Sequence, residues 1–475
     1  MTETVKVDIA VVGGGAGGLA VAAGAAQMGA SVLLFEKGHM GGDCLNYGCV
    51  PSKATIAAAH AAAVFRHAGR FGIAPQTPGV DAAALRRHVQ EVIAAIAPHD
   101  SVERFEGLGV RVVEAPARFV GRRQLEGGGV RVQARWIVLA TGSAPVVPPI
   151  PGLDGLPFLT NETVFDLEET PGHLLVLGGG PVGIELAQAH RRLGAEVTVV
   201  QRGPILPRDD ADAVAFIRAR LVREGVRLCE NAAVTAASGG SGAVTLHFET
   251  EGRGETIQGT HLLVAAGRRP VLEDLDLNAG GIAWTPAGVT VDSRLRASDK
   301  RVFAVGDLAG ELHFTHVAGY HAGIAIRNAL FRLPAKADTT AAPWVTYTDP
   351  ELAHVGFTEA EATQAFRRKV RVLRHDFAEN DRAQAERETE GFVKAVVGPG
   401  RRVLGATIVG RHAGELIQPW VLAVSQKLRI GALAGMIAPY PTLGEASKRA
   451  AGSYYTDALF GLRTRCLVRF LMRFA

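Results

Sequence analysis

Cysteine is scarce in this sequence, with four residues in a chain of 475. Four thiols cannot cross-link a chain of this length, so the fold must depend on a buried core and not on a disulfide framework. No feature of the sequence pairs Cys229 or Cys466 with another cysteine. The simplest interpretation is that Cys229 is a thiol in the core and Cys466 a thiol in the C-terminal tail. Cys44 and Cys49 lie five residues apart, and in a reducing compartment such a pair is more typical of catalysis, redox chemistry or metal binding than of a structural staple.

Long apolar runs, targeting signals and strong net charge are also missing. No window of about 18 uncharged apolar residues occurs, so no membrane-spanning segment is predicted. The N-terminal residues lack the basic start and small-residue cleavage site of a secretory signal, and we therefore expect an intracellular, cytoplasmic protein. The net charge of +4 is small for this length, and no basic stripe carries interleaved aromatic residues, so a nucleic-acid partner is not expected.

The chain does contain an internal repeat. Residues 8–38 align without gaps with residues 173–203 at a constant offset of 165. Each copy reads as an apolar strand, a glycine turn, a helix and a second apolar strand. Each copy also carries G-x-G-x-x-G between its first strand and its helix, and the glycines are Gly13, Gly15 and Gly18 in the first copy and Gly178, Gly180 and Gly183 in the second.

These glycine fingerprints predict two dinucleotide sites. The first glycine allows a tight turn, the second lets the backbone approach a pyrophosphate at the helix N-terminus, and the third lets helix and strand pack closely. Glu36 ends the second strand of the first copy, where its carboxylate can accept both ribose hydroxyls, so we assign this site to an unphosphorylated dinucleotide such as FAD. Gln201 and Arg202 end the second copy. Without the carboxylate and with an arginine, this site favours the 2′-phosphate of NADPH over NADH. The alternative interpretation is that Arg202 is a solvated surface arginine that does not contact the nucleotide.

Three later segments read as a strand that ends in a glycine turn. We expect the second segment, residues 261–270, to close the nicotinamide-nucleotide domain. In the third segment, residues 300–310, the carboxylate of Asp307 can bond a ribityl hydroxyl of a flavin. The composition after Pro334 changes to alternating strand-like runs followed by a helical segment, which predicts a separate α+β domain. The three segments are ARWIVLATGSAP, with Thr141 and Gly142 at its turn, HLLVAAGRRP, with Gly267, and KRVFAVGDLAG, with Gly306 and Asp307.

In this order the motifs resemble the pyridine nucleotide-disulfide oxidoreductase family, whose members include dihydrolipoamide dehydrogenase, glutathione reductase and mercuric reductase. The resemblance covers nearly the whole chain, and GGDCLNYGCVPSK (41–53) is highly specific for it. It implies an α/β fold with two Rossmann-like dinucleotide-binding domains and a C-terminal α+β dimerisation domain, in a homodimer that binds FAD and NAD(P)H. The expected limits are residues 1–147 and 268–340 for the FAD-binding domain, 148–267 for the NAD(P)H-binding domain and 341–475 for the dimerisation domain.

The resemblance also implies roles for individual residues. Cys49 would be the thiolate next to the flavin, and Cys44 the interchange thiol that meets the acceptor. Lys53 would lie near the flavin and pair with Glu185, and its ammonium would favour reduced flavin and lower the pKa of the thiolate. The residues that would anchor FAD are Glu36 and Asp307.

The spacing of the two cysteines supports a redox pair independently. On an ideal helix five residues subtend about 140°, so Cys44 and Cys49 face each other only if the helix is distorted, which Gly48 can supply. A strained bridge is easier to reduce. We therefore rank a redox pair above a structural staple, and a metal site lowest because no further ligands lie nearby.

One motif departs from the disulfide-reducing members of the family, in which a His-Pro-Thr…Glu motif supplies a proton-carrying histidine across the dimer interface. Here the stretch is APYPTLGEASK (438–448), with Tyr440 at the histidine position and Glu445 retained. An imidazole with a pKa near 6.5 exchanges protons at neutral pH, whereas a phenol with a pKa near 10 is a poor base. Tyrosine here resembles mercuric reductase, although this chain has only Cys466 where that enzyme usually carries a second cysteine pair.

These features predict an enzyme that passes electrons from NADPH through FAD to the Cys44–Cys49 disulfide. Tyr440 and Glu445 of the partner subunit would complete the pocket. The acceptor would be a disulfide, including a protein thiol partner, a metal-thiol complex such as Hg(II), or a quinone-like compound. One alternative is a dihydrolipoamide dehydrogenase variant that uses NAD. Another is a redox-sensing or binding flavoprotein in which the cysteine pair does not turn over.

The C-terminal tail, GLRTRCLVRFLMRFA (461–475), mixes arginines with leucine and phenylalanine. A terminal helix docked on its own dimer is the favoured interpretation. The alternative is a weak peripheral membrane contact, because basic amphipathic helices bind anionic interfaces.

Overall fold

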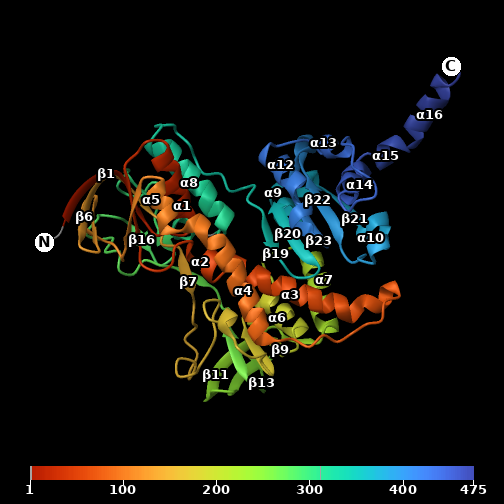
Figure 1. Cartoon of the computed structure of the whole chain (residues 1–475). Coiled ribbons are helices and arrows are strands. Elements are labelled where there is room, and N and C mark those ends of the chain that lie inside the picture. The colour runs from red at the N-terminus through yellow and green to blue at the C-terminus, as the bar shows by residue number, and fades with distance from the viewer. Residues whose placement is uncertain (1–2, 311, 475) are drawn as a thin grey trace.

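The computed structural model describes residues 3–310 and 312–474 (Figure 1). Its first unit is built on a seven-stranded sheet in the order β3-β2-β1-β6-β5-β4, with β18 paired to β6. β1, β2, β3, β6 and β18 run parallel, so their carboxyl ends share one edge of the sheet. The strands are β1 (Glu3–Val12), β2 (Val32–Glu36), β3 (Val110–Glu114), β4 (Arg118–Gly121), β5 (Gln124–Gly127), β6 (Val130–Leu139) and β18 (Val302–Ala304).

Helices from distant parts of the sequence surround this sheet. α1 (Ala16–Gln27) and α8 (Thr315–Ala329) pack against each other (Figure 1). α3 packs both on α4 and on a helix of the second unit. The other elements of this unit are α2 (Gly42–Asn46), α3 (Cys49–His67), α4 (Ala82–Ile96), α5 (Val102–Gly107), the short strand β7 (Ser143–Pro145) with its partner β15 (Arg268–Pro270), and the pair β16 (Trp284–Thr285) and β17 (Gly288–Val289).

The second unit repeats the first on a smaller scale. Its parallel sheet has the order β10-β9-β8-β14, and a separate antiparallel sheet has the order β11-β12-β13. The elements are β8 (His173–Leu177), α6 (Pro181–Arg192), β9 (Glu196–Val200), α7 (Ala211–Arg223), β10 (Val226–Cys229), β11 (Ala232–Gly240), β12 (Ala243–Thr250), β13 (Arg253–Gly259) and β14 (His261–Val264).

The internal repeat of the sequence is preserved in the strand register. Ile9 pairs with Val32 in the first sheet, and Leu174 pairs with Val197 in the second, which is the same pair shifted by the repeat offset. The first glycine of each fingerprint has a positive φ, 106° at Gly13 and 120° at Gly178. A Cβ at either position would collide with a backbone carbonyl of a neighbouring strand end, so only glycine fits.

The third unit is built on a five-stranded antiparallel sheet in the order β19-β20-β23-β22-β21. Trp420 is fully buried against it, and its indole N–H donates to Ser447. The elements are β19 (Trp344–Thr346), β20 (Glu351–Gly356), α9 (Glu359–Phe366), β21 (Arg371–Asp376), α10 (Asp381–Glu386), β22 (Phe392–Val397), β23 (Val403–Gly410), α11 (Ala413–Leu416), α12 (Gln418–Ser425), α13 (Ile430–Ala434), α14 (Glu445–Ser453), α15 (Thr456–Leu459) and α16 (Leu462–Leu471).

The predicted fold class is confirmed. Two parallel sheets with matching strand–helix–strand units precede an antiparallel sheet with helices, as the α/β and α+β assignments require. The numerical domain limits stay predictions. The fold places the carboxyl ends of β1, β6 and β18 side by side, which brings their glycine turns into one region.

Candidate active site

A cavity of about 1000 Å³ lies at the carboxyl edge of the first sheet and is closed on one side by the third unit. Segments 343–347 and 414–418 supply that wall. The cavity gathers most of the residues that the sequence singled out, and those that line it are Gly13, Gly15, Glu36, Cys44, Cys49, Lys53, Thr141, Gly142, Glu185, Gly306 and Asp307.

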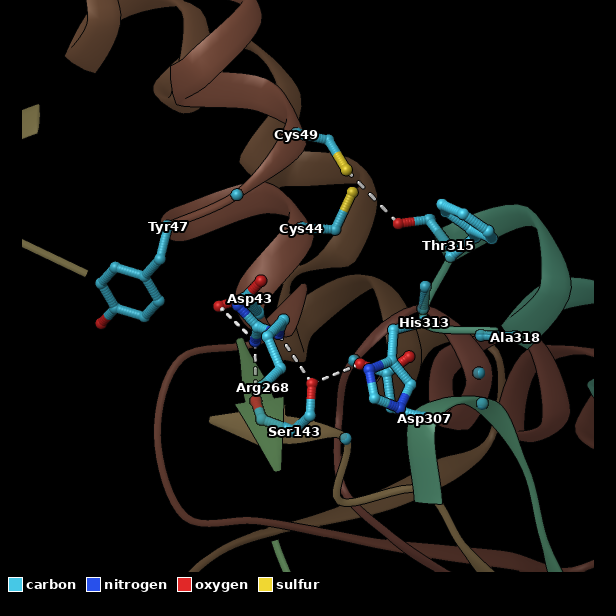
Figure 2. A pocket seen from close by; sticks show the side chains of 18 of the residues that line it. Asp43, Cys44, Tyr47, Cys49, Ser143, Arg268, Asp307, His313, Thr315 and Ala318 are labelled. Atoms are coloured by element: carbon cyan, nitrogen blue, oxygen red, sulfur yellow. Dashed lines mark hydrogen bonds and ion pairs between the residues drawn. The ribbon is translucent and has the colours of Figure 1, made fainter. Parts of the chain in front are cut away.

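The two cysteines lie on different helices. Cys44 belongs to α2, and Cys49 is the first residue of α3. Gly48 separates the helices with φ −125° and ψ −109°, which is the distortion that the spacing predicted. A Cβ on Gly48 would lie 2.9 Å from Asp43 Oδ2 and 3.0 Å from the Asp43 carbonyl oxygen. The break turns both sulfur atoms toward each other as free thiols (Figure 2).

The surroundings of the pair distinguish the two sulfurs. The pKa of Cys49 is lowered to about 6, chiefly by its hydrogen bond with Cys44 and further by Thr315 and the Lys53 ammonium, while burial opposes the shift. The Thr315 hydroxyl lies 3.5 Å from Cys49 Sγ (Figure 2). The pKa of Cys44 is raised, first by the same hydrogen bond and then by burial. The reduced pair therefore holds its negative charge on Cys49, at the N-terminus of α3, and its proton on Cys44.

Lys53 is held by two groups beside the cysteines. Its Nζ donates to Glu185 Oε2 at 2.8 Å, and it lies 4.3 Å from the centroid of the Tyr347 ring. The other oxygen, Glu185 Oε1, accepts from the backbone N–H of Tyr347 at 2.8 Å. Glu185 is buried on α6, so this ion pair fixes α3 of the first unit against the second unit. The ammonium is thereby kept close to the thiolate.

Asp307 belongs to a polar chain that crosses the cavity floor (Figure 2). Ser143 donates from Oγ to Asp307 Oδ2 at 2.5 Å, and Arg268 Nε donates to Ser143 Oγ at 2.8 Å. Arg268 also lies 3.2 Å from Asp43 Oδ1, and Asn161 donates to the same oxygen at 3.0 Å. The chain joins the Gly306-Asp307 turn to the residue that precedes Cys44.

The first fingerprint fits FAD. Gly15 is the N-cap of α1, and the nearest atom to an added Cβ would be 3.8 Å away, so the helix N-terminus is open toward the cavity. Glu36 accepts from the backbone N–H of Gly14 and, at 2.6 Å, from that of Gly38. Its carboxylate is thus fixed at the end of β2, where a ribose would lie. Gly18 lies in α1 against the Gly13 carbonyl, and the absence of a side chain there lets the helix pack closely on the turn.

The glycines of the second fingerprint lie outside the lining of this cavity, whereas Pro181 and Val182 between them belong to it. Gly180 is the N-cap of α6, and an added Cβ there would meet no atom within 4 Å, which leaves its N-terminus open. Gln201 Oε1 accepts from the Gly179 N–H at 2.9 Å, as Glu36 does in the first copy. Arg202 is exposed. The residues predicted for NAD(P)H that do not line the cavity are Gly178, Gly180, Gly183, Gln201, Arg202 and Gly267.

Tyr440 and Glu445 are not gathered into the cavity of their own chain. Tyr440 is 68% exposed, and its hydroxyl donates to Asp381 Oδ2 at 2.8 Å. This hydrogen bond raises the pKa of Tyr440, so the phenol stays protonated at neutral pH. Glu445 accepts from Arg449, and the structure shows no hydrogen bond between Glu445 and Tyr440 among the described residues.

The sequence did not single out three residues that shape the site. Thr315 contacts Cys49, Tyr347 covers Lys53, and Arg268 joins Ser143 to Asp43. Thr315 follows the Gly306-Asp307 turn closely, and Arg268 follows Gly267 directly. Their places next to predicted strand-end turns indicated that their side chains lie near the site, but the sequence did not indicate which groups they contact.

Comparison with known proteins agrees with this geometry. The family profile described as "Pyridine nucleotide-disulphide oxidoreductase" matches residues 7–322, and the profile for the dimerisation domain of that family matches residues 342–451. The dimerisation match supports the predicted homodimer.

Similar proteins include enzymes with different names. The chain is 35% identical over 459 residues to a mercuric reductase of Streptomyces lividans, covering 95% of this chain and 96% of that one. It is 34% identical over 455 residues to a dihydrolipoyl dehydrogenase of Geobacillus stearothermophilus, covering 94% and 96%.

Solved structures show the same fold. The Cu(II) complex of the HOCl-induced flavoprotein disulfide reductase RclA from Escherichia coli matches with a TM-score of 0.84 at 26% identity, covering 94% of this chain and 99% of that one. LpdA from Mycobacterium tuberculosis matches with a TM-score of 0.86 at 28% identity, covering 94% and 100%. The chain belongs to the pyridine nucleotide-disulphide oxidoreductase family, whose members are FAD-dependent and use NAD(P)H.

Proposed function

We propose that this protein is an NADPH-dependent flavoprotein reductase whose Cys44–Cys49 pair passes electrons to a thiophilic metal ion, of the Hg(II) or Cu(II) type. The observation that carries the proposal is the division of charge within the pair, with a thiolate on Cys49 and a protonated thiol on Cys44. A metal ion binds thiolates and needs no proton from the protein. This suits a site in which Tyr440 stands in place of a proton-carrying histidine.

Each residue of the site has a proposed task. Cys49 keeps the thiolate on the flavin side, and Cys44 contacts the acceptor. Lys53, held by Glu185, stabilises negative charge next to Cys49. Asp307 and Glu36 would hold FAD, which, when bound, supplies a two-electron relay between the nicotinamide and the cysteines.

The electrons balance in this scheme. NADPH supplies two electrons as a hydride, and reduction of the Cys44–Cys49 disulfide consumes two electrons and one proton, leaving a thiol and a thiolate. The return of the pair to the disulfide releases two electrons and the Cys44 proton; the electrons convert one Hg(II) to Hg(0) or two Cu(II) to Cu(I), and the proton passes to solvent. Similarity to proteins named mercuric reductase and to a Cu(II) complex of RclA supports this class of acceptor.

The preference for NADPH is part of the proposal. Arg202 is exposed beside the end of β9, and Gln201 removes the carboxylate that would repel a 2′-phosphate. Arg202→Gln should raise the KM for NADPH by about tenfold and leave that for NADH unchanged, since one charge-assisted contact is worth about 1.5 kcal/mol. Equal catalytic efficiency of the native protein with both nucleotides would contradict this assignment.

Dihydrolipoamide oxidation with NAD is the second candidate, favoured by the similarity to a dihydrolipoyl dehydrogenase. A dithiol substrate must lose protons to a base, and Tyr440 is protonated at neutral pH, so we expect this activity to be weak.

The test is anaerobic reduction of the protein by NADPH, followed by addition of Hg(II) or Cu(II) as thiol complexes. We expect a long-wavelength band from the Cys49 thiolate beside the flavin after two electrons, and loss of that band when metal is added. Cys44→Ser should keep the band and lose metal reduction. Bleaching of the flavin without the band, or faster turnover of oxidised lipoamide or of a quinone than of either metal, would overturn the proposal.

A further inference from the structure

At its C-terminal end the described chain extends away from the body of the molecule (Figure 1). α16 continues from α15 and projects away from the third unit (Figure 1). The dimerisation-domain match ends at residue 451, before either helix begins. The tail therefore lies outside the part of the chain that the dimerisation-domain profile matches.

From Arg465 onward the tail has a basic side and an apolar side, whereas Arg463 lies one turn before Leu467 on the apolar side, and Val468 and Met472 flank the basic side. Arg465, Arg469 and Arg473 follow one another at a spacing of four, which places them in one row along the helix. The apolar residues on the opposite side are spaced i, i+3, i+4 and i+7. These residues are Leu467, Phe470, Leu471 and Phe474.

The geometry of the side chains agrees with this division. The rings of Phe470 and Phe474 lie on one side with their centroids 5.1 Å apart. All four apolar side chains of that face are more than half exposed. Large apolar side chains exposed as a contiguous group mark an interaction surface, whereas single ones do not.

The charge of the tail identifies the partner. Residues 458–475 contain Arg463 and the three arginines of the row, and no aspartate or glutamate. In the part of the chain that the structure describes, none of the four arginines has a carboxylate within ion-pair distance. A second copy of the tail would bring the same positive row and repel it. An anionic surface with an apolar interior satisfies both faces together.

We propose that α16 and the residues that follow it to Phe474 bind the surface of an anionic lipid membrane, with Leu467, Phe470, Leu471 and Phe474 in the acyl boundary and the arginine row among the headgroups. Short basic amphipathic helices bind in this way, parallel to the surface. No described helix is long and apolar enough to cross a bilayer, so the contact is peripheral. A homodimer carries two such helices, which strengthens binding through effective concentration.

Flotation of the full-length holoprotein with vesicles tests the proposal. We expect binding to vesicles of phosphatidylcholine mixed with phosphatidylglycerol, and little binding to phosphatidylcholine alone. Replacing the row, Arg465→Gln, Arg469→Gln and Arg473→Gln together, should weaken partitioning about a hundredfold, given the usual contribution of each basic residue near an anionic surface. Replacing Leu467, Phe470 and Leu471 by serine should also abolish binding.

A matched control removes three charges elsewhere. Arg253, Arg332 and Lys336 are exposed, and their replacement by glutamine should leave vesicle binding unchanged. Three outcomes overturn the proposal: no binding of the native protein to anionic vesicles, equal loss in the control, or conversion of a tail variant to a monomer in light scattering. The last would show that the tail packs on the partner subunit. NADPH oxidation by the tail variants should stay at the native rate, so a failure here is distinct from a failure of the proposed function.

Discussion

At the scale of single residues, the reactivity of the site depends on how one proton is shared between Cys44 and Cys49. Thr315 contributes through its hydroxyl, which lies 3.5 Å from Cys49 Sγ and favours the thiolate. The pKa of Cys49 is about 6, so the thiolate predominates above this pH and is protonated below it.

Thr315→Val should therefore raise the pKa of Cys49, because the thiolate loses a hydrogen-bond donor while the sulfur stays buried. The pH at which half of the fast alkylation by iodoacetamide is lost should move up from about 6. Thr315→Ser keeps the hydroxyl and should titrate like the native protein. An unchanged midpoint in the valine variant would mean that Thr315 does not act on the thiolate.

Tyr440 is the residue that, in our proposal, separates this chain from the dithiol-oxidising members of its family. Its hydrogen bond to Asp381 raises the pKa of the phenol, which makes it a weaker base still. Tyr440→His should increase dihydrolipoamide oxidation by at least about tenfold, since a positioned imidazole contributes on the order of 100-fold or more. A steady-state assay of dihydrolipoamide oxidation measures this increase.

Tyr440→Phe provides the control for that substitution, because it removes the hydroxyl without adding an imidazole. An equal increase in the phenylalanine variant would mean that the tyrosine merely obstructs the substrate.

At the scale of elements, the break between α2 and α3 makes the cysteine pair possible. Gly48 adopts a backbone conformation in which an added Cβ would press on the carbonyl and the carboxylate of Asp43. Gly48→Ala should displace α2 from α3 and separate the sulfurs.

The expected effect is a loss of at least about tenfold in the rate at which the reduced pair closes to a disulfide, since a displacement of about 1 Å can cost a hundredfold. Release of the second thiol from an aromatic disulfide reagent reports this closing step. Gly452→Ala lies in α14, where a Cβ meets no atom within 4 Å, and should have no effect. Closure at the native rate in Gly48→Ala would show that the break does not align the thiols.

At the scale of the whole molecule, the second and third units are joined by a buried cation. Lys394 on β22 is 3% exposed, and its Nζ lies 2.9 Å from Asp210 Oδ2, 2.6 Å from Asp212 Oδ2 and 3.1 Å from Glu359 Oε2. Asp210 is buried and is also the N-cap of α7. The third unit thereby holds α7, the helix between β9 and β10 of the second unit.

Lys394→Met should lower the free energy of unfolding by about 3–5 kcal/mol, because it leaves a buried carboxylate without its cation. Urea unfolding followed by tryptophan fluorescence measures this loss. The exposed Lys336→Met is the control and should change stability by less than about 0.5 kcal/mol. A change in the free energy of unfolding as small as this in Lys394→Met would show that water or structural relaxation compensates for the lost ion pair.

Much of this architecture could be predicted because the determining interactions are local. The fingerprint glycines, the strand–helix–strand order and the register of both repeats follow from the steric needs of a tight turn and from apolar periodicity over some 30 residues. The break at Gly48 likewise followed from the angle between two positions on one helix.

The remaining parts of the site depend on contacts between residues far apart in the chain. Cys49 and Thr315 are 266 positions apart, and Lys53 and Tyr347 are brought together by different units. Arg268 reaches Asp43 because β15 pairs with β7. No periodicity or spacing encodes such contacts, since they arise only when the sheets stack.

The sequence by itself determined two nucleotide folds and a redox-active pair of cysteines, and it predicted the loss of the usual proton carrier at Tyr440. It did so because turns, strands and helices obey short-range sterics and because imidazole and phenol differ in pKa. Only the tertiary structure decided that Thr315 contacts Cys49, that Tyr347 covers Lys53 and that the basic tail stands clear of its own subunit. Those properties depend on distance and burial, which a chain acquires only when its distant segments pack together.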